Sequence, residues 1–281
     1  MDQFSSHPLY RKHNLDSVMS TLWSFYSGKF VVLFIASFIM SLGMQLLTLT
    51  FDIRGLMTTT DPAEILDKVR GMILPIVGIS LMSLIFTNIL QYYVIYSPVD
   101  SSVTIFTSIY KSLKYFIPYL IIMILFGFMG SFAMVLGLFV LIIGIFFAML
   151  YMVTLFLFVL PILMVEGTDI GHAIARTFTL AHRGFWSNIG WVAVFLIILM
   201  VASMILSSLI LLPFSGSFLK ILTNPEEAAN AMNFMTNPVY LTLSALIRAL
   251  YFPMVPILGA ILYFNGKARE EEVKTPAIEN S

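Results

Sequence analysis

The sequence predicts an all-α polytopic membrane protein whose six transmembrane helices form three hairpins, each preceded by an amphipathic interfacial helix. Three observations lead to this fold class. First, 59% of the 281 residues are hydrophobic and 11% are charged, whereas about 25% of the residues in a soluble domain are charged. Second, the apolar residues gather into runs that reach the roughly 20 residues needed to cross a hydrocarbon core. Third, polar stretches with helix-capping residues separate several of these runs.

The apolar runs define the domain organisation. We expect a cytoplasmic N-terminus with one interfacial helix at 1–29, a transmembrane domain at 30–264, and a charged, disordered cytoplasmic tail at 265–281. The predicted spans are 30–50, 72–95, 115–136, 139–165, 189–212 and 239–264.

One apolar stretch must hold two of these spans. No charged residue occurs from Tyr115 to Val165, and the stretch is about twice the length that one span needs. We therefore expect a tight turn near Gly127, Gly130 or Gly137, because glycine removes the steric cost of bending.

The clearest interfacial helix is predicted between spans four and five, within residues 166–188. Thr168 or Asp169 can cap its start, and an acid there also suits the positive end of the helix dipole. Arg183 lies near its end and Gly184 follows as a stop signal. Apolar residues recur between these ends at helical spacing, so one face suits the membrane and the other suits the headgroups.

Similar stretches begin at Asp16 and Asp100, which predicts a threefold internal repeat. Aligning both with Asp169 places the segments SGKF, KYF and HRGFW at the same junction with the following span. Each repeat is then an interfacial helix followed by two spans. Coincidental matching of apolar segments is the alternative. In the outer loops, residues 61–71 and 224–235 share a cap, proline and acid pattern that predicts two short helices.

The distribution of Lys and Arg predicts the orientation. Of the 15 such residues, ten lie in segments that are inside if the N-terminus is inside, four lie outside, and Arg248 lies in a span. Since positive residues resist translocation, both termini are expected in the cytoplasm.

The chain also resembles a known family. The segments PILMVEGTDIGHAIARTFTLAHRGFW and LYFNGKAREEE are similar to the six-span membrane domain fused to some bacterial glycerophosphoryl diester phosphodiesterases, and to stand-alone bacterial inner-membrane proteins of unassigned function. The resemblance implies a bacterial cytoplasmic-membrane protein. It does not imply phosphodiesterase activity, which belongs to a separate soluble domain that we do not expect after Phe264. Asn265 and Lys267 depart from the family pattern of Asp and Arg. The resembling residues are Pro161, Glu166, Gly167, Ala173, Arg176, Trp186, Leu262, Tyr263 and Arg269.

Arg248 is the most informative candidate for a functional site, because a charge inside a span costs about 2.5–3.5 kcal/mol on insertion scales. It could contact an anion or a lipid phosphate. Alternatively it pairs with backbone carbonyls, Asn88 or Gln45, or extends to the outer surface. Pro253 and Pro256 break the same span, either along a substrate pathway or as simple kinks.

The interfacial helix at 166–188 offers a second candidate site. His172, Arg176 and Arg183 could bind headgroup phosphates, or could serve only as a positive-inside anchor. Glu166 could act as a base, but a salt bridge to Arg176 or Arg269 is the alternative. Because no second titrating group lies in a span, no acid–base pair is predicted.

These patterns predict a non-enzymatic protein whose inner-leaflet helices bind lipid headgroups or a protein partner at the cytoplasmic face. No catalytic residue, metal or cofactor is predicted, and cysteine is absent. A net charge of zero gives no reason to expect nucleic acid. The alternatives are a transporter or lipid-handling protein that uses Arg248 and the broken sixth span, and an intramembrane enzyme that uses Glu166 and His172. The oligomeric state stays open.

Overall fold

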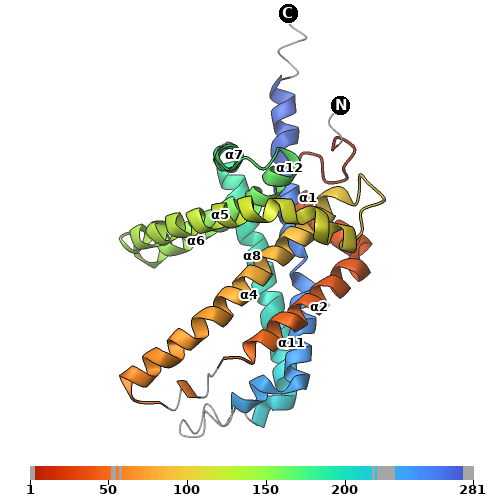
Figure 1. The fold of residues 1–281 in the computed structure, drawn as a ribbon. Helices are drawn as coiled ribbons and strands as arrows, with labels where there is room; N and C mark the ends of the chain where they lie inside the picture. Colours follow the sequence, from red (N-terminus) through yellow and green to blue (C-terminus); the bar gives the residue numbers. More distant parts are fainter. Residues whose placement is uncertain (1–3, 52–54, 57–58, 217–218, 220–231, 275–281) are drawn as a thin grey trace, which may run out of the picture. The chain divides into compact units, whose positions relative to one another are not determined.

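The structure is a computed structural model that describes residues 4–51, 55–56, 59–216, 219 and 232–274. These residues are predominantly helical, and six helical segments are long and apolar enough to cross a membrane, as the sequence predicts. The main helices are α1 (Leu15–Gly28), α2 (Phe30–Thr48), α4 (Pro62–Tyr96), α5 (Ile105–Leu138), α6 (Leu141–Val165), α7 (Ile170–Arg183), α8 (Phe185–Leu211), α11 (Pro238–Tyr251) and α12 (Met254–Lys274), with short 3-10 helices η1 (Leu212–Phe214) and η3 (Met232–Thr236) (Figure 1).

The chain forms two compact units. Unit 1 comprises residues 1–30, 87–197 and 253–281, and unit 2 comprises residues 31–86 and 198–252. Of the four boundaries, two fall inside α4 and α8, one follows the first residue of α2 and one lies between α11 and α12. Both α4 and α8 therefore contribute residues to both units.

The core of unit 1 is built around α6. This helix packs along α5 and also contacts α7 and α12, and α12 contacts α1. Figure 1 shows α5 and α6 side by side. They are joined by Phe139 and Val140, directly after the glycines among which the turn was predicted. A Cβ atom on Gly137 would lie 2.7 Å from the carbonyl carbon of Gly144, so these two glycines permit the close approach of α5 and α6.

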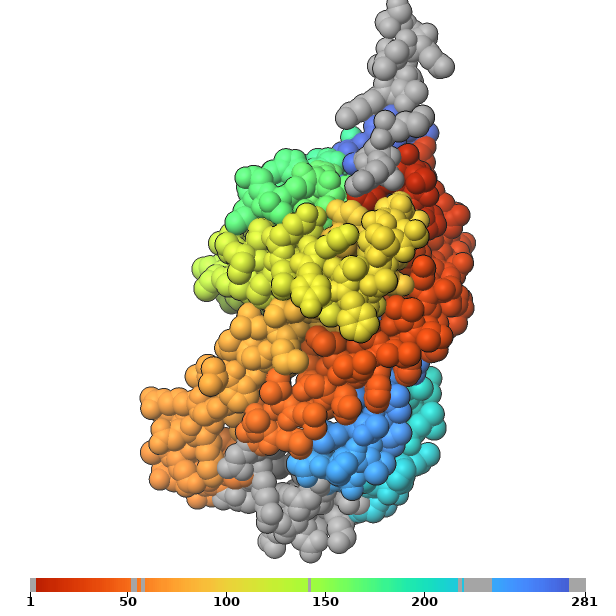
Figure 2. All heavy atoms as spheres, turned by 45° about the vertical axis from the view of Figure 1, so that its right-hand side comes forward, coloured from red at the N-terminus to blue at the C-terminus, as the bar shows by residue number. Residues whose placement is uncertain are grey.

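The outward face of α5 is apolar. Phe106, Tyr110, Phe128 and Phe132 each expose at least 66% of their surface, and α5 occupies much of the visible surface of unit 1, in yellow to yellow-green (Figure 2). An exposed apolar face of this extent suits contact with lipid chains rather than water.

Separate helices form at two of the three predicted interfacial positions. The helices α1 and α7 end at Gly28 and before Gly184, and each is followed at once by a span-length helix. The third stretch, at 100–115, instead continues into its span as α5, and Thr104 rather than Asp100 caps the start. No glycine stands between Thr104 and Gly127 to end the helix, and α5 continues through Pro118.

The helix predicted at 61–71 is likewise continuous with span two. Asp61 caps its start, since the Oδ1 atom of Asp61 accepts a hydrogen bond from the N–H of Ala63 at 3.0 Å, and Pro62 is the first helical residue as predicted. The helix then passes through Gly71 without interruption and ends at Tyr96. Most of the other predicted outer helix, at 224–235, lies outside the described residues; its last part forms η3.

The sixth predicted span consists of two helices. The first, α11, ends at Tyr251, and the second, α12, begins at Met254, so the chain breaks at Pro253 as its two prolines suggested. The second helix extends to Lys274, whereas the sequence predicted disorder from residue 265. Residues 275–281 lie outside the described part of the chain.

We predict that Gly137→Ala destabilises unit 1, because the added methyl group would overlap the backbone of α6 at Gly144. Overpacking of this kind costs about 1–3 kcal/mol. Gly127→Ala is the matched control, since it lies on the same helix with nothing within 4 Å of its Cβ position. Thermal unfolding in detergent should show a midpoint below that of the wild type for Gly137→Ala but not for Gly127→Ala. Equal midpoints for the two variants would show that the close approach is unimportant.

Candidate functional site

The best-connected polar group in unit 1 is the guanidinium of Arg176, on α7. Its Nε atom donates to the Glu166 carboxylate, at 3.1 Å from Oε1 and 2.9 Å from Oε2. Its Nη1 atom donates to Glu270 Oε1 at 2.6 Å, and Nη2 donates to the other oxygen of Glu270. The side chains of all three residues are at most 18% exposed. Arg176 therefore joins two carboxylates from different helical segments through both edges of its planar group.

The local sequence explains why Glu166, at the end of α6, lies close to Arg176 of α7. Helix α6 ends at Val165, and Glu166 is its C-cap residue. Gly167 then adopts a φ of 119°, which a residue with a side chain rarely adopts, and this allows the chain to turn between α6 and α7. Asp169 caps α7 by accepting a hydrogen bond from the N–H of His172 at 2.6 Å. The short connection thus returns α7 close to the end of α6.

Further contacts extend this arginine–carboxylate cluster, which comprises Glu166, Arg176, Arg183, Tyr263 and Glu270. Arg183 Nη1 lies 2.8 Å from Glu270 Oε1, and the Tyr263 hydroxyl donates to Glu166 Oε1 at 2.9 Å. Two arginines face two carboxylates, so the formal charge of the cluster is zero. Its cations are therefore already paired within the protein, and they link α7 to α12.

The remaining residues predicted for this site lie at its edge. His172 Nε2 is 3.8 Å from Glu166 Oε2, and its side chain is half exposed. Of the two partners predicted for Glu166, Arg176 is the one present. Arg269 instead donates to the carbonyl of His13 at 3.1 Å and to Asn265 Oδ1 at 3.3 Å.

Sequence reasoning missed the contribution of the N-terminal segment, residues 4–13. His7 is buried and stacks on Phe264 of α12 with ring centroids 4.6 Å apart. Burial lowers the pKa of His7 to about 4, so the ring is neutral at pH 7. A neutral ring fits the contacts observed: Nδ1 accepts from the N–H of Leu9 at 3.1 Å, and Nε2 lies 3.3 Å from the carbonyl of Val94.

Glu270 is a further member of the cluster that the sequence does not predict, because it lies in the segment expected to form a disordered tail. The only signal available was the charged segment KAREEE after span six, which a continuing helix would carry toward α7.

Arg248 occupies a different environment, in unit 2. Tyr240, Ser244, Arg248 and Tyr251 follow one another at helical spacing along one face of α11, and Ile247 joins them. They line a cavity of about 210 Å³ together with Gln45 of α2 and with Ser207, Ile210 and Leu211 of α8. The cavity is therefore rich in hydroxyl and amide groups.

The partners predicted for Arg248 are not observed. Asn88, in unit 1, donates to the carbonyl of Ser112 at 2.7 Å, and Gln45 lines the same cavity without a hydrogen bond to Arg248. Among the described residues, no carboxylate lies within 4.0 Å of the Arg248 guanidinium and no hydrogen bond is formed by it. Arg248 is half-buried in a polar cavity with its donors available.

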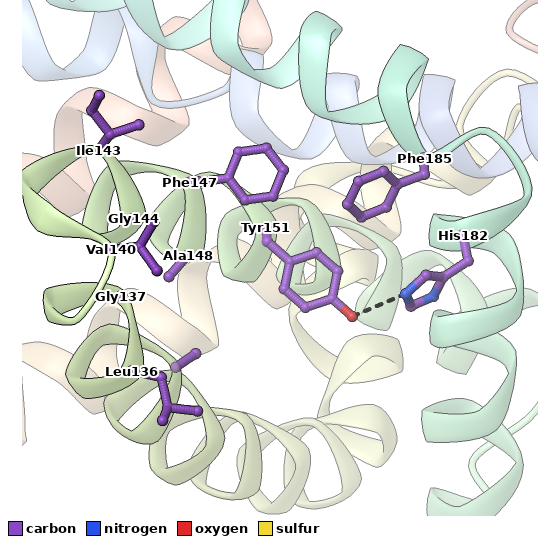
Figure 3. A pocket seen from close by; sticks show the side chains of 11 residues that line it. Leu136, Gly137, Val140, Ile143, Gly144, Phe147, Ala148, Tyr151, His182 and Phe185 are labelled. Carbon is purple, nitrogen blue, oxygen red and sulfur yellow. Dashed lines mark hydrogen bonds between the residues drawn. The ribbon is translucent and has the colours of Figure 1, made fainter.

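A larger groove in unit 1 offers little polar chemistry. It encloses about 640 Å³ between the ends of α5 and α6 and the residues His182 and Phe185, and its walls are almost wholly apolar. Figure 3 shows the Tyr151 hydroxyl and His182 facing each other, and Nε2 lies 3.3 Å from that hydroxyl. His182 Nδ1 lies 2.8 Å from the carbonyl of Phe178, so neither ring nitrogen is without a polar neighbour. The described residues contain no group of three metal-ligating side chains.

We predict that Arg176→Gln destabilises the protein, because it leaves the largely buried Glu166 carboxylate without its arginine and Glu270 with Arg183 alone, so that one negative charge is in excess. Removing one member of a buried ion pair costs roughly 3 kcal/mol or more. Lys12→Gln is the control, since its pair with Glu272 is about half exposed on both sides and exposed pairs contribute about 0–1 kcal/mol. The midpoint of thermal unfolding should fall only for Arg176→Gln. A fall of equal size in both variants would contradict the importance assigned to the cluster.

Comparison with known proteins adds no assignment. No protein-family model, no curated protein and no solved structure matches the chain. What the protein does must therefore be argued from the geometry of its own residues.

Proposed function

We propose that this chain is a non-enzymatic integral membrane protein that binds a phosphate-bearing anion at Arg248 and passes it through the membrane. The ligand class includes the headgroup of an anionic lipid and a small phosphate-bearing solute. One observation carries the proposal: within the part of the chain that the structure describes, the Arg248 guanidinium has no protein partner although it lines a polar cavity, whereas Arg176 and Arg183 are paired with carboxylates.

The energetics favour a ligand at Arg248. A cation inside a membrane span is costly, and proteins usually offset this with a paired anion or a wet cavity. Arg248 follows Pro238 by ten residues, which is about 15 Å along the helix axis. If α11 begins at one boundary of a hydrocarbon core about 30 Å thick, Arg248 lies near its middle.

The groups around Arg248 suit a phosphate. A guanidinium can donate two parallel hydrogen bonds to phosphate oxygens, and Ser207, Ser244 and Tyr240 can supply hydroxyl donors from the same cavity. A volume of about 210 Å³ holds several water molecules at about 30 Å³ each, so a phosphate with part of its hydration shell fits there.

The proposal changes the role first expected for the interfacial helix α7. Lipid headgroups were expected to bind Arg176 and Arg183, yet both side chains already donate to Glu270 and Arg176 also donates to Glu166. An intramembrane enzyme gains no support either, because both oxygens of Glu166 accept hydrogen bonds from Arg176.

The proposal includes a topology. Six crossings as three hairpins, with both termini in the cytoplasm of a bacterium, are supported by the excess of Lys and Arg in the inner segments and by the family resemblance. The separate helices α1 and α7, each directly before a span-length helix, support the repeat of the first and third segments. They also offer a cytoplasmic face to a protein partner.

The transport role predicts that Arg248→Gln lowers flux about tenfold, because a charge-assisted hydrogen bond contributes about 1.5–3 kcal/mol and 1.4 kcal/mol corresponds to a factor of ten. The assay uses proteoliposomes that contain either fluorescent phosphatidylglycerol or trapped inorganic phosphate. The two arms show whether the anion moved is a lipid or a solute.

Arg70→Gln is the matched control, because it removes the same charge from an exposed position of unit 2. Its flux should equal that of the wild type. Equal flux through Arg248→Gln and Arg70→Gln, or no flux above that of protein-free vesicles in either arm, would remove the transport role.

A further inference from the structure

A second basic cavity lies in unit 1, where the N-terminal segment meets α1. It encloses about 400 Å³ and is lined by Arg11 and Lys29, by the hydroxyl-bearing Thr21 and Ser24, and by Pro8, Leu9, Phe25, Gly28 and Pro98. No residue that lines the Arg248 cavity takes part.

The two cations are held in place by their backbone. Leu9 is 1% exposed, and its N–H donates to the buried His7, which fixes the segment that carries Arg11. The Arg11 guanidinium donates to Thr21 Oγ1 of α1. Lys29 is the C-cap residue of α1, and its N–H donates to the carbonyls of Phe25 and Tyr26 at 3.2 Å each.

The charge of this cavity is not neutralised within the described part of the chain. There, no carboxylate lies within 4.0 Å of the side-chain nitrogens of Arg11 or Lys29, in contrast to Arg176 and Arg183. The end of α1 contributes a partial negative charge of about half an elementary charge at most. Two full positive charges exceed it, so the cavity favours an anion.

The walls favour a lipid over a free anion. Leu9, Phe25 and the two prolines place apolar surface beside the cations and hydroxyls. Lys29 directly precedes α2, a span-length helix with no charged residue, so this cation stands where a span would enter the headgroup layer. Charged donors next to apolar walls match the phosphate and the glycerol backbone of a phospholipid.

We infer that Arg11 and Lys29, together with the hydroxyls of Thr21 and Ser24, bind the phosphodiester of an anionic phospholipid headgroup at the membrane surface. The site holds a lipid in place beside the first span. It is independent of transport at Arg248, because it uses other residues in the other unit.

The test measures phosphatidylglycerol binding to the full chain by native mass spectrometry from detergent. Every variant carries Arg248→Gln, so that lipid bound at Arg248 does not contribute to the result. Arg11→Gln with Lys29→Gln should weaken binding about tenfold, since each cation near a membrane surface contributes appreciably to anionic-lipid affinity. Lys29→Gln alone should weaken it by roughly threefold, and it keeps the Arg11 contact to Thr21 that could matter for folding.

Lys111→Gln with Lys114→Gln is the matched control, because it removes two charges from α5 in the same unit. Its affinity should stay within about twofold of the parent. Equal weakening by both pairs would show unspecific attraction, and no weakening by Lys29→Gln would remove the site. Displacement of the lipid by inorganic phosphate at matched concentration would assign the cavity to a free anion and overturn the lipid assignment.

Discussion

The pairing of Arg176 with Glu166 and Glu270 is the interaction on which unit 1 depends. Helix α7 has only 14 residues, and an isolated helix of that length is marginal in water. The Arg176 guanidinium of α7 contacts Glu166 at the end of α6 and Glu270 of α12. Arg176 and Glu270 are 94 residues apart in the sequence. A close backbone approach supports the same assembly, because a Cβ atom on Gly259 of α12 would lie 2.7 Å from the Leu157 carbonyl of α6. Charge pairing and small residues together bring these helices into contact.

This pairing also bears on where we propose that an anion binds. The arginines of α7 are in a cluster without net charge, so their number alone is a poor guide to binding. Arg248 in unit 2, and Arg11 with Lys29 in unit 1, have no carboxylate nearby among the described residues. Both cavities add hydroxyl groups to the cations. Whether a cation is already paired, rather than which helix carries it, separates the structural residues from the candidate binding residues.

Properties set by local sequence could be predicted. The length of the apolar runs gave the six span-length helices, and the stop at Gly184, the caps at Asp61 and Asp169 and the break at Pro253 follow from backbone chemistry near each residue. Features that depend on distant contacts could not. The burial of His7 against Phe264, and the contact of Glu270 with Arg176, join residues that a linear pattern leaves unrelated. The continuity of α5 departs from the repeat because this segment lacks the glycine that stands at the end of α1 and directly after α7.

The claim that charge pairing holds unit 1 together is tested most directly by neutralising Arg176 together with its two carboxylates. If the instability of Arg176→Gln arises from the excess negative charge that it leaves on Glu166 and Glu270, adding Glu166→Gln and Glu270→Gln should restore most of the lost stability, since uncharged replacements of a buried ion network are often tolerated. Arg183, the other cation of the cluster, is 39% exposed and can then be hydrated. Thermal unfolding of the single and triple variants in the same detergent measures this. The account predicts a higher midpoint for the triple variant than for Arg176→Gln, and a midpoint equal to or below that of the single variant would contradict it.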